Sequence, residues 1–276
     1  MSEIAILTTC YNRRESTINC LKSIYENIER DQNNHYRIYV VDDNSTDDTV
    51  DAVKTMFPKV NIVVSGGNLY WARGMYAAMK MAYEDNNDYY YMINDDALFR
   101  DTAFEIMMSS YHMARRECAI VGSFLSKETG EPTYGGFSRA YKLVHPSEEL
   151  TPCECANWNC FFVPKTIIDK VGYIDKRYAH GGGDYDYCYM MHRLGLEILV
   201  AYDYVGFCER NSTKGTYRDN TLPKIQRMRK LFSRKEFHFP SMFHFYLKNF
   251  GIKGLLQLGI LYYSKISKII CKEECS

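Results

Sequence analysis

The feature that most constrains this chain is a short apolar and aromatic run that ends abruptly in an amide and two carboxylates. The run covers residues 89–93, and Asn94, Asp95 and Asp96 follow it directly. Aromatic and β-branched side chains favour a strand, and a cluster of Asn and Asp usually ends one. We therefore expect a buried strand that places these polar groups at its carboxyl end, where open α/β sheets bind ligands. For this segment alone, a plain turn or helix N-cap is the alternative.

The preceding residues repeat the order strand, loop, helix. Apolar runs predict strands over 4–9, 36–41 and 60–64, and apolar residues at helical spacing predict helices over 18–28, 50–57 and 75–82. Further on, residues 157–165 read as a strand, and a helix opens after three glycines and ends at Gly195. Alternation of this kind predicts an α/β fold with a parallel sheet covered on both faces, so that four loops meet at one edge.

Composition and charge indicate the size of the fold and the kind of binding partner that the chain can have. The chain has 276 residues, 46% hydrophobic and 25% charged, which fits one large globular domain with an appendage. Lys plus Arg and Asp plus Glu both total 34, so no overall basic charge points to nucleic acid. The balance is uneven, since residues 221–276 hold 11 Lys or Arg against three Asp or Glu, a local charge of +8. This asymmetry predicts an anionic surface as a partner of the tail.

Ten cysteines raise the question of compartment and metal binding. The first residues enter a strand pattern without a signal peptide, so we expect reduced thiols and a cytoplasmic location. Cys153, Cys155 and Cys160 lack the paired Cys-x-x-Cys spacing of a zinc site. Buried small hydrophobic side chains are the better interpretation of these three residues.

Neither a Walker A sequence nor Gly-x-Gly-x-x-Gly occurs in the four loops. The charge of a bound diphosphate would have to be neutralised in another way, and a divalent metal on Asp96 could do so. Asp42 or Asp43 could accept hydrogen bonds from a base or a ribose. An Asx turn with a helix cap over residues 42–48 is the alternative, and it is compatible with that role.

Three segments together resemble a known family. Residues 8–13 (Thr-Thr-Cys-Tyr-Asn-Arg), 40–49 and 94–96 are similar to the successive signatures of family 2 glycosyltransferases with the GT-A fold, over about residues 4–204. The resemblance implies a mostly parallel, Rossmann-like sheet flanked by helices, inverting chemistry, a nucleotide-diphosphate sugar (UDP- or dTDP-linked) and Mn²⁺ or Mg²⁺. It places the metal on Asp96. The nucleotide-binding residues that it implies are Thr8, Thr9, Tyr11, Arg13, Asp42, Asp43, Asn68, Arg73 and Asp95.

The resemblance also implies the general base. Asp184 follows Gly181, Gly182 and Gly183 at the first turn of the expected helix, where the helix dipole favours an ionised carboxylate. By this resemblance, Asp184 corresponds to the Asp of the family's Glu-Asp motif, and Gly183 stands in place of the Glu. A second departure is Asn94, which replaces the first acid of the family's Asp-x-Asp pattern and is a weaker metal ligand.

Candidate sugar contacts are Trp71, Asn94, Trp158 and Asp186. Both tryptophans could frame sugar rings, and a role in the core is the alternative for each. Within the polar segment 207–215, Arg210 and Lys214 are candidates for a loop over the diphosphate, with an ordinary solvated loop as the alternative.

The last segment, 239–270, mixes apolar and basic residues, and its apolar runs are too short to span a bilayer. We expect amphipathic helices that lie on a membrane surface, or that pack on the domain or on another subunit of a homo-oligomer. The expected organisation is a GT-A domain over 1–220, with a nucleotide-binding half (1–100) and an acceptor-binding half (101–220), and a basic helical tail over 221–276.

The sequence thus predicts transfer of a hexosyl or deoxyhexosyl unit to the hydroxyl of a saccharide, including a lipid-linked one. The resemblance extends to rhamnosyltransferase-like enzymes of bacterial surface polysaccharide and capsule biosynthesis at the inner face of the plasma membrane. A nucleotidyltransferase and a catalytically silent sugar-binding module remain as alternatives, and neither donor nor linkage follows from the sequence.

Overall fold

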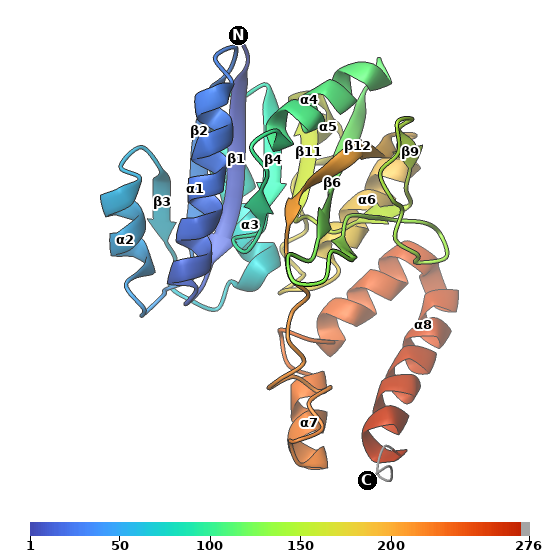
Figure 1. Ribbon diagram of the computed structural model, residues 1–276. Coiled ribbons are helices and arrows are strands. Elements are labelled where there is room, and N and C mark those ends of the chain that lie inside the picture. The colour runs from blue at the N-terminus through green and yellow to red at the C-terminus, as the bar shows by residue number, and fades with distance from the viewer. Residues whose placement is uncertain (272–276) are drawn as a thin grey trace.

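The computed structural model describes residues 1–271, and its centre is a twisted mixed sheet of ten strands (Figure 1). The strand order along the main path is β3-β2-β1-β4-β11-β6-β12-β5, with β7 beside β6 and β9 beside β12. The strands of this sheet are β1 (Glu3–Cys10), β2 (His35–Asp42), β3 (Asn61–Val64), β4 (Tyr89–Ile93), β5 (Leu98–Phe99), β6 (Cys118–Leu125), β7 (Pro132–Tyr134), β9 (Thr151–Pro152), β11 (Cys160–Pro164) and β12 (Glu197–Phe207). A separate pair joins β8 (Gly136–Phe137) to β10 (Cys155–Ala156).

The N-terminal half of the sheet is parallel, as the alternating pattern predicts. Strand β1 pairs in parallel with β2 and β4, and β2 pairs in parallel with β3. Their carboxyl ends therefore lie at one edge, which confirms the predicted convergence of loops. Nearly every residue of β1 and β4 is buried, because helices cover both faces of the sheet.

The second half of the sheet is mixed. Strand β11 runs antiparallel to both β4 and β6, and β12 then pairs in parallel with β6. The strand expected over residues 157–165 begins only at Cys160, and Lys165 already opens a helix. Trp158 and Asn159 precede the strand as buried turn residues.

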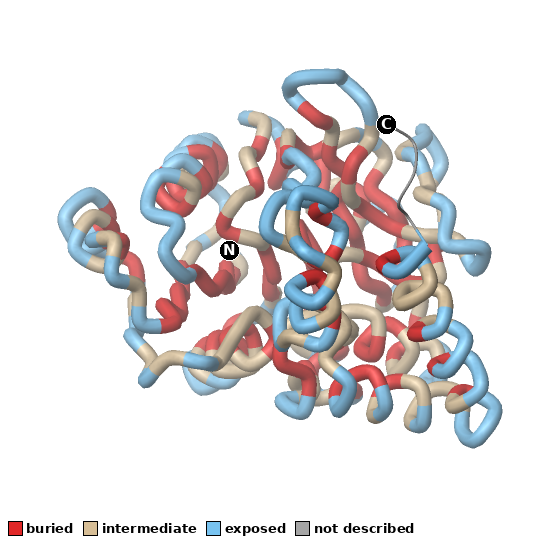
Figure 2. The backbone as a smooth tube through the Cα atoms, turned by 90° about the horizontal axis from the view of Figure 1, so that it is seen from below, coloured by how far each residue is buried: buried red, intermediate tan, exposed pale blue. Residues whose placement is uncertain are grey.

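Helices cover the sheet in two layers. They are α1 (Arg14–Arg30), α2 (Thr49–Met56), α3 (Tyr70–Glu84), α4 (Ala103–Ala114), α5 (Lys165–Val171) and α6 (Gly183–Arg193). One core cluster joins the sheet to α3, α5 and α6, and a second joins its other face to α1, α2 and α4. Figure 2 shows buried residues concentrated in the interior of the molecule and exposed residues in the outer loops and outer helix turns.

The tail forms a third, smaller cluster. Helix α7 (Lys224–Leu231) and the second half of α8 (Phe239–Cys271) pack side by side and project beyond the sheet (Figure 1). Helix α8 breaks at Gly251, whose φ of 61° and ψ of −149° are not helical. The predicted tail helices are thus present, while residues 272–276 of the expected tail lie outside the described residues. Within the described part of the chain, no helix is both long and apolar enough to cross a membrane.

The cysteines of the candidate zinc group lie apart. Cys153 and Cys155 belong to the core cluster on the α6 face, whereas Cys160 belongs to the cluster on the opposite face of the sheet. All three thiols are buried, and burial raises their pKa values. They serve as small core side chains.

A close backbone contact joins two loops at the carboxyl edge. Strand β5, just after Asp96, pairs with the end of β12 through Phe99 and Gly206. A Cβ added at Gly206 would lie 2.1 Å from the carbonyl oxygen of Leu98 and 3.0 Å from the Cα of Phe99. Because both obstacles are backbone atoms, only glycine allows this approach.

We expect Gly206→Ala to destabilise the fold by about 1–3 kcal/mol, since the strands must separate to admit the methyl group. Differential scanning calorimetry should show a melting temperature lowered by several degrees. Gly259→Ala is the matched control, because a Cβ there meets no atom within 4 Å and helix α8 favours alanine. An unchanged melting temperature for Gly206→Ala would show that the strand pair is not as tight as described.

Candidate active site

An ion cluster occupies the carboxyl edge of the sheet. Arg13, which lies just before α1, places Nη1 2.8 Å from Oδ1 of Asp95 and 2.9 Å from Oδ2 of Asp96. Thr17 adds a hydroxyl that donates to Asp95. Asp95 is buried and Asp96 is partly exposed. Burial raises the pKa of Asp95 to about 6, against the opposing effect of Arg13.

Asn94 and Trp71 are also brought together. The indole Nε1 of Trp71 donates to Oδ1 of Asn94 at 2.8 Å, which connects the start of α3 to the end of β4. Both residues remain partly exposed. The amide that replaces the family's first acid therefore holds an aromatic ring at the site, and its carbonyl oxygen is already engaged.

Trp158 does not frame an open sugar site in this structure. Its side chain is 1% exposed, stacks on Phe161 at 5.2 Å and meets Tyr187 edge to face. The alternative role in the core describes it correctly, because large aromatic rings fill the space between the sheet and α6. It also packs against Trp71 in a T-shaped arrangement, with 5.9 Å between the ring centroids.

The two acids after β2 hold the loops in place. Asp42 is fully buried, and its Oδ1 accepts the amide of Ser45 at 2.7 Å. The expected contact with a base or ribose is not available to Asp42 here, because the surrounding loop covers it. Asp43 accepts the backbone amides of Leu69 and Tyr70, both at 2.9 Å, so it caps the start of α3, a contact that neither sequence interpretation anticipated.

Thr8 and Thr9 lie beneath this surface. Both are buried, and the hydroxyl of Thr9 donates to the carbonyl of Val41. A Cβ added at Gly74 would come within 2.3 Å of the Thr9 Oγ1, so α3 packs directly on the end of β1. Thr9 thus lies directly beneath α3.

The remaining nucleotide-site candidates face outward. Tyr11 is exposed, and the ammonium of Lys235 lies 5.9 Å from its ring centroid. Asn68 adopts a left-handed φ of 65° in the loop before α3. Arg73 donates from Nε to the carbonyl of Lys176, which connects α3 to the segment before α6.

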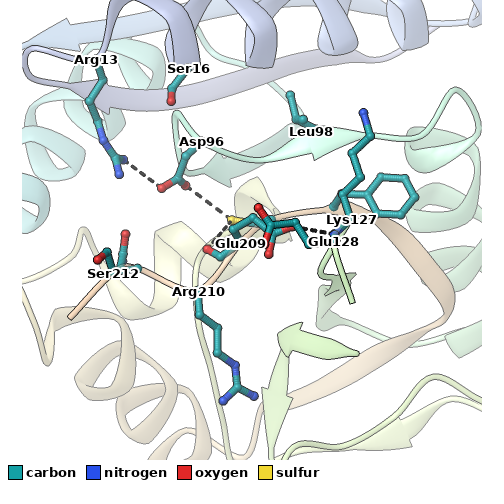
Figure 3. A pocket seen from close by; sticks show the side chains of 12 residues that line it. Arg13, Ser16, Asp96, Leu98, Lys127, Glu128, Glu209, Arg210 and Ser212 are labelled. Atoms are coloured by element: carbon teal, nitrogen blue, oxygen red, sulfur yellow. Dashed lines mark hydrogen bonds and ion pairs between the residues drawn. The ribbon is translucent and has the colours of Figure 1, made fainter. Parts of the chain in front are cut away.

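A cavity of about 450 Å³ opens beside Asp96. Arg13 and Asp96 point toward one another at its wall, and the Sγ of Cys208 lies 3.6 Å from Asp96 (Figure 3). Arg210 lines the cavity, but its guanidinium points away from Asp96 and donates to the carbonyl of Pro132 (Figure 3). Lys214 is exposed and is not among the residues that line this cavity.

Asp184 lies on the first turn of α6, as predicted. Its Oδ1 accepts the amide of Tyr185 at 3.0 Å. The helix dipole at this position favours the ionised carboxylate. Desolvation acts in the opposite direction and raises the pKa of Asp184 to about 6, close to the range in which a general base works best.

The structure explains why a glycine precedes Asp184. A Cβ at Gly183 would lie 2.9 Å from Cδ1 of Ile174 and 3.3 Å from the Cβ of Ala72. The amide of Ala72 also donates to the carbonyl of Ala179 at 3.1 Å. A larger residue here would require Ile174 and Ala72 to shift, because the start of α3 packs against the loop before Asp184. The same contact joins this loop to the helix from which Trp71 reaches Asn94.

Asp186 is not free to contact a sugar. It is 1% exposed, and its two oxygens accept Lys248 Nζ at 2.6 Å and Asn249 Nδ2 at 2.8 Å. Two residues along a helix lie on nearly opposite sides, so Asp186 turns toward α8 while Asp184 turns away from it. The prediction of a sugar contact is replaced by a contact with the C-terminal helix.

Sequence reasoning missed His180. Its Nδ1 is buried without a hydrogen-bond partner among the described residues. Burial, with the positive charges of Lys235 and Arg13, lowers the pKa of His180 to about 4, so the ring is neutral. The one feature of the sequence that could have pointed to His180 is its position directly before the three glycines, four residues before Asp184.

The side chains at this edge fit a metal that takes few protein ligands. Within residues 1–271, no group of three His, Cys, Asp or Glu side chains converges on a common point. Asp96 offers one partly exposed carboxylate. Mg²⁺ and Mn²⁺ are commonly held by one or two carboxylates together with substrate phosphates and water, so this donor set is compatible with such a cation.

Comparison with known proteins identifies the family. The model of glycosyl transferase family 2 matches residues 5–172. Among solved structures, the mannosyltransferase PcManGT from Pyrobaculum calidifontis, in complex with GDP-Man and Mn²⁺, is similar with a TM-score of 0.55 and 14% identity, over 99% of this chain and 76% of that one. At this identity the likeness shows the fold, and no curated protein matches. Because the family model covers more than half of the sequence, the chain belongs to glycosyl transferase family 2.

Proposed function

We propose that the protein transfers a sugar from a nucleotide-diphosphate donor to a saccharide hydroxyl with inversion, and that Asp184 is the general base. The observation that carries the proposal is the position of Asp184 at the start of α6, partly desolvated, in a loop packed against α3. Residues 1–100 would bind the donor and 101–220 the acceptor, with 221–276 as a tail. That PcManGT is solved with GDP-Man supports a nucleotide-sugar donor.

The proposed reaction uses the chain's own residues in two places. Asp184 accepts the proton of the acceptor hydroxyl, whose oxygen attacks the anomeric carbon in line with the leaving diphosphate. Near Asp96, Arg13 provides a guanidinium that can pair with phosphate oxygens. A divalent cation on Asp96 would neutralise further charge on the leaving group. Trp71, held by Asn94, presents a ring at which a sugar can pack.

A nucleotidyltransferase and a silent sugar-binding module remain as alternatives. A nucleotidyltransferase would use a similar sheet-edge site but would release pyrophosphate. A silent module would not need a carboxylate with its pKa near 6 in the acceptor half, so the environment of Asp184 favours a transferase.

We expect Asp184→Asn to lower the rate of transfer by about 10²–10⁴-fold, because an amide cannot accept the acceptor proton. Donor affinity, measured by calorimetry, should stay near the wild-type value. In the wild type, the rate should fall as the pH drops through about 6, where Asp184 becomes protonated.

Asp203→Asn is the matched control for that variant. Asp203 is exposed on β12 and, like Asp184, accepts the backbone amide of the tyrosine that follows it. It should retain wild-type activity. An active Asp184→Asn enzyme would remove the assignment of the base.

We expect Mn²⁺ to strengthen donor binding in the wild type and to have little effect on Asp96→Asn. The control is Asp101→Asn, another carboxylate paired with an arginine at 2.9 Å, which is exposed and does not line the cavity beside Asp96. Calorimetry with UDP-, dTDP- and GDP-sugars, with Mn²⁺ or with a chelator, gives the affinities. Equal binding under both conditions would contradict the metal role of Asp96.

The tail supports a proposed attachment to an anionic membrane surface, which suits a lipid-linked acceptor at the inner face of the plasma membrane. Beyond Gly251, α8 exposes an apolar stripe at helical spacing: Ile252, Leu256, Ile260 and Tyr263, between 60% and 84% exposed. Lys253 and Lys268 are exposed on the same half of the helix, which contains no acidic residue among 252–271. Each basic residue near such a surface contributes about 1 kcal/mol.

We expect the protein to cosediment with anionic liposomes at low salt and to be released at high salt. Replacing the four stripe residues by Gln should abolish binding, whereas replacing the exposed Met56 and Val64 should not. Protein that stays in the supernatant at low salt would contradict the attachment. If the stripe variant instead converts a dimer into a monomer in size-exclusion chromatography, the stripe is a subunit interface.

A further inference from the structure

A polar cluster connects the C-terminal helix to the helix that carries Asp184. The buried carboxylate of Asp186 takes both of its side-chain partners, Lys248 and Asn249, from the first half of α8. A buried carboxylate requires such partners, because its desolvation is otherwise uncompensated. The tail therefore completes the environment of α6.

The same lysine reaches a second carboxylate on the other side of the glycine loop. Lys248 Nζ lies 3.5 Å from Oδ2 of Asp175, which also receives His244 Nε2 at 3.1 Å and Arg177 Nη2 at 2.7 Å. Although burial acts to raise it, these hydrogen bonds hold the pKa of Asp175 well below its usual range. Asp175 precedes Asp184 in the chain and Asp186 follows it. The ammonium group of Lys248 therefore contacts both ends of the segment that contains the proposed base.

The segment between them needs an external support. Gly182 has a φ of 92°, and consecutive glycines at 181–183 leave the backbone many accessible conformations. Helix α8 packs closely over this point, since a Cβ at Gly182 would lie 3.2 Å from Cε of Met242. The amide of Asp186 donates to the carbonyl of Gly182 at 2.9 Å. A displacement of Asp186 would therefore also displace the glycine loop.

We propose that Lys248 is a positioning residue, which acts through Asp186 and Asp175 to hold Asp184 in the orientation needed for proton abstraction. This role rests on the proposed function of Asp184. Helix α8, up to Gly251, is then part of the catalytic machinery, and only the half beyond Gly251 is free to act as a peripheral surface. Because the donor site lies at the sheet edge, the loss of Lys248 should affect turnover and not donor binding.

The test compares Lys248→Met and Lys248→Arg with Lys54→Met, an exposed lysine on helix α2 that belongs to no proposed binding surface. For Lys248→Met we expect the kcat per donor-binding site to fall about 10- to 100-fold with little change in donor KM, since small misplacement of a reacting group has effects of this size. Lys248→Arg should recover part of the rate, and Lys54→Met should equal the wild type. An unchanged kcat per binding site, even with a lower melting temperature, would overturn the proposal, as would a loss confined to donor KM.

Hydrogen exchange provides a readout that does not depend on turnover. In Lys248→Met, the amides of residues 178–190 should exchange faster than in the wild type, while those of β2 should not change. Unchanged exchange over 178–190 would also overturn the positioning role. If the wild type transfers no sugar but this local difference is present, the proposed function fails while the structural support of the loop by Lys248 stands.

Discussion

The carboxyl edge of the sheet depends on the guanidinium of Arg13, which lies between Asp95 and Asp96. A buried strand that ends in two adjacent acids would otherwise bring like charges together in a poorly solvated place. Arg13 belongs to the loop after β1, so the ion cluster also ties the ends of two neighbouring parallel strands. Under the proposed function, a diphosphate or a cation that enters the cavity would share these charges.

A second constraint is the close packing of the two halves of the domain. The start of α3 contacts the loop before α6 through Ala72 and Ala179, and Gly183 leaves the space for that contact. Trp71 reaches back to Asn94 from the same helix. Both departures from the family pattern therefore have a local reason: the glycine permits the approach of α3, and the amide holds the aromatic ring beside the acids.

Much of this fold followed from periodicity, because strands buried on both faces and helices with one apolar face leave clear patterns. Residues 89–96 marked the edge at which the parallel strands end. Periodicity does not predict which single polar or aromatic side chains are buried by segments far away in the sequence. Trp158 is covered by Phe161 and Tyr187, and Asp186 by a helix some 60 residues later in the chain. His180 was missed because only its surroundings, not its type, distinguish it from a surface histidine.

The central claim is sugar transfer with inversion, and the configuration of the product tests it most directly. A donor with a known anomeric configuration, selected from nucleotide-diphosphate sugars that bind, is incubated with the protein and a saccharide acceptor, and the new glycosidic linkage is analysed by NMR. The account predicts the opposite anomeric configuration and release of a nucleoside diphosphate. A product with the donor's configuration, or release of pyrophosphate in place of the nucleoside diphosphate, would contradict it.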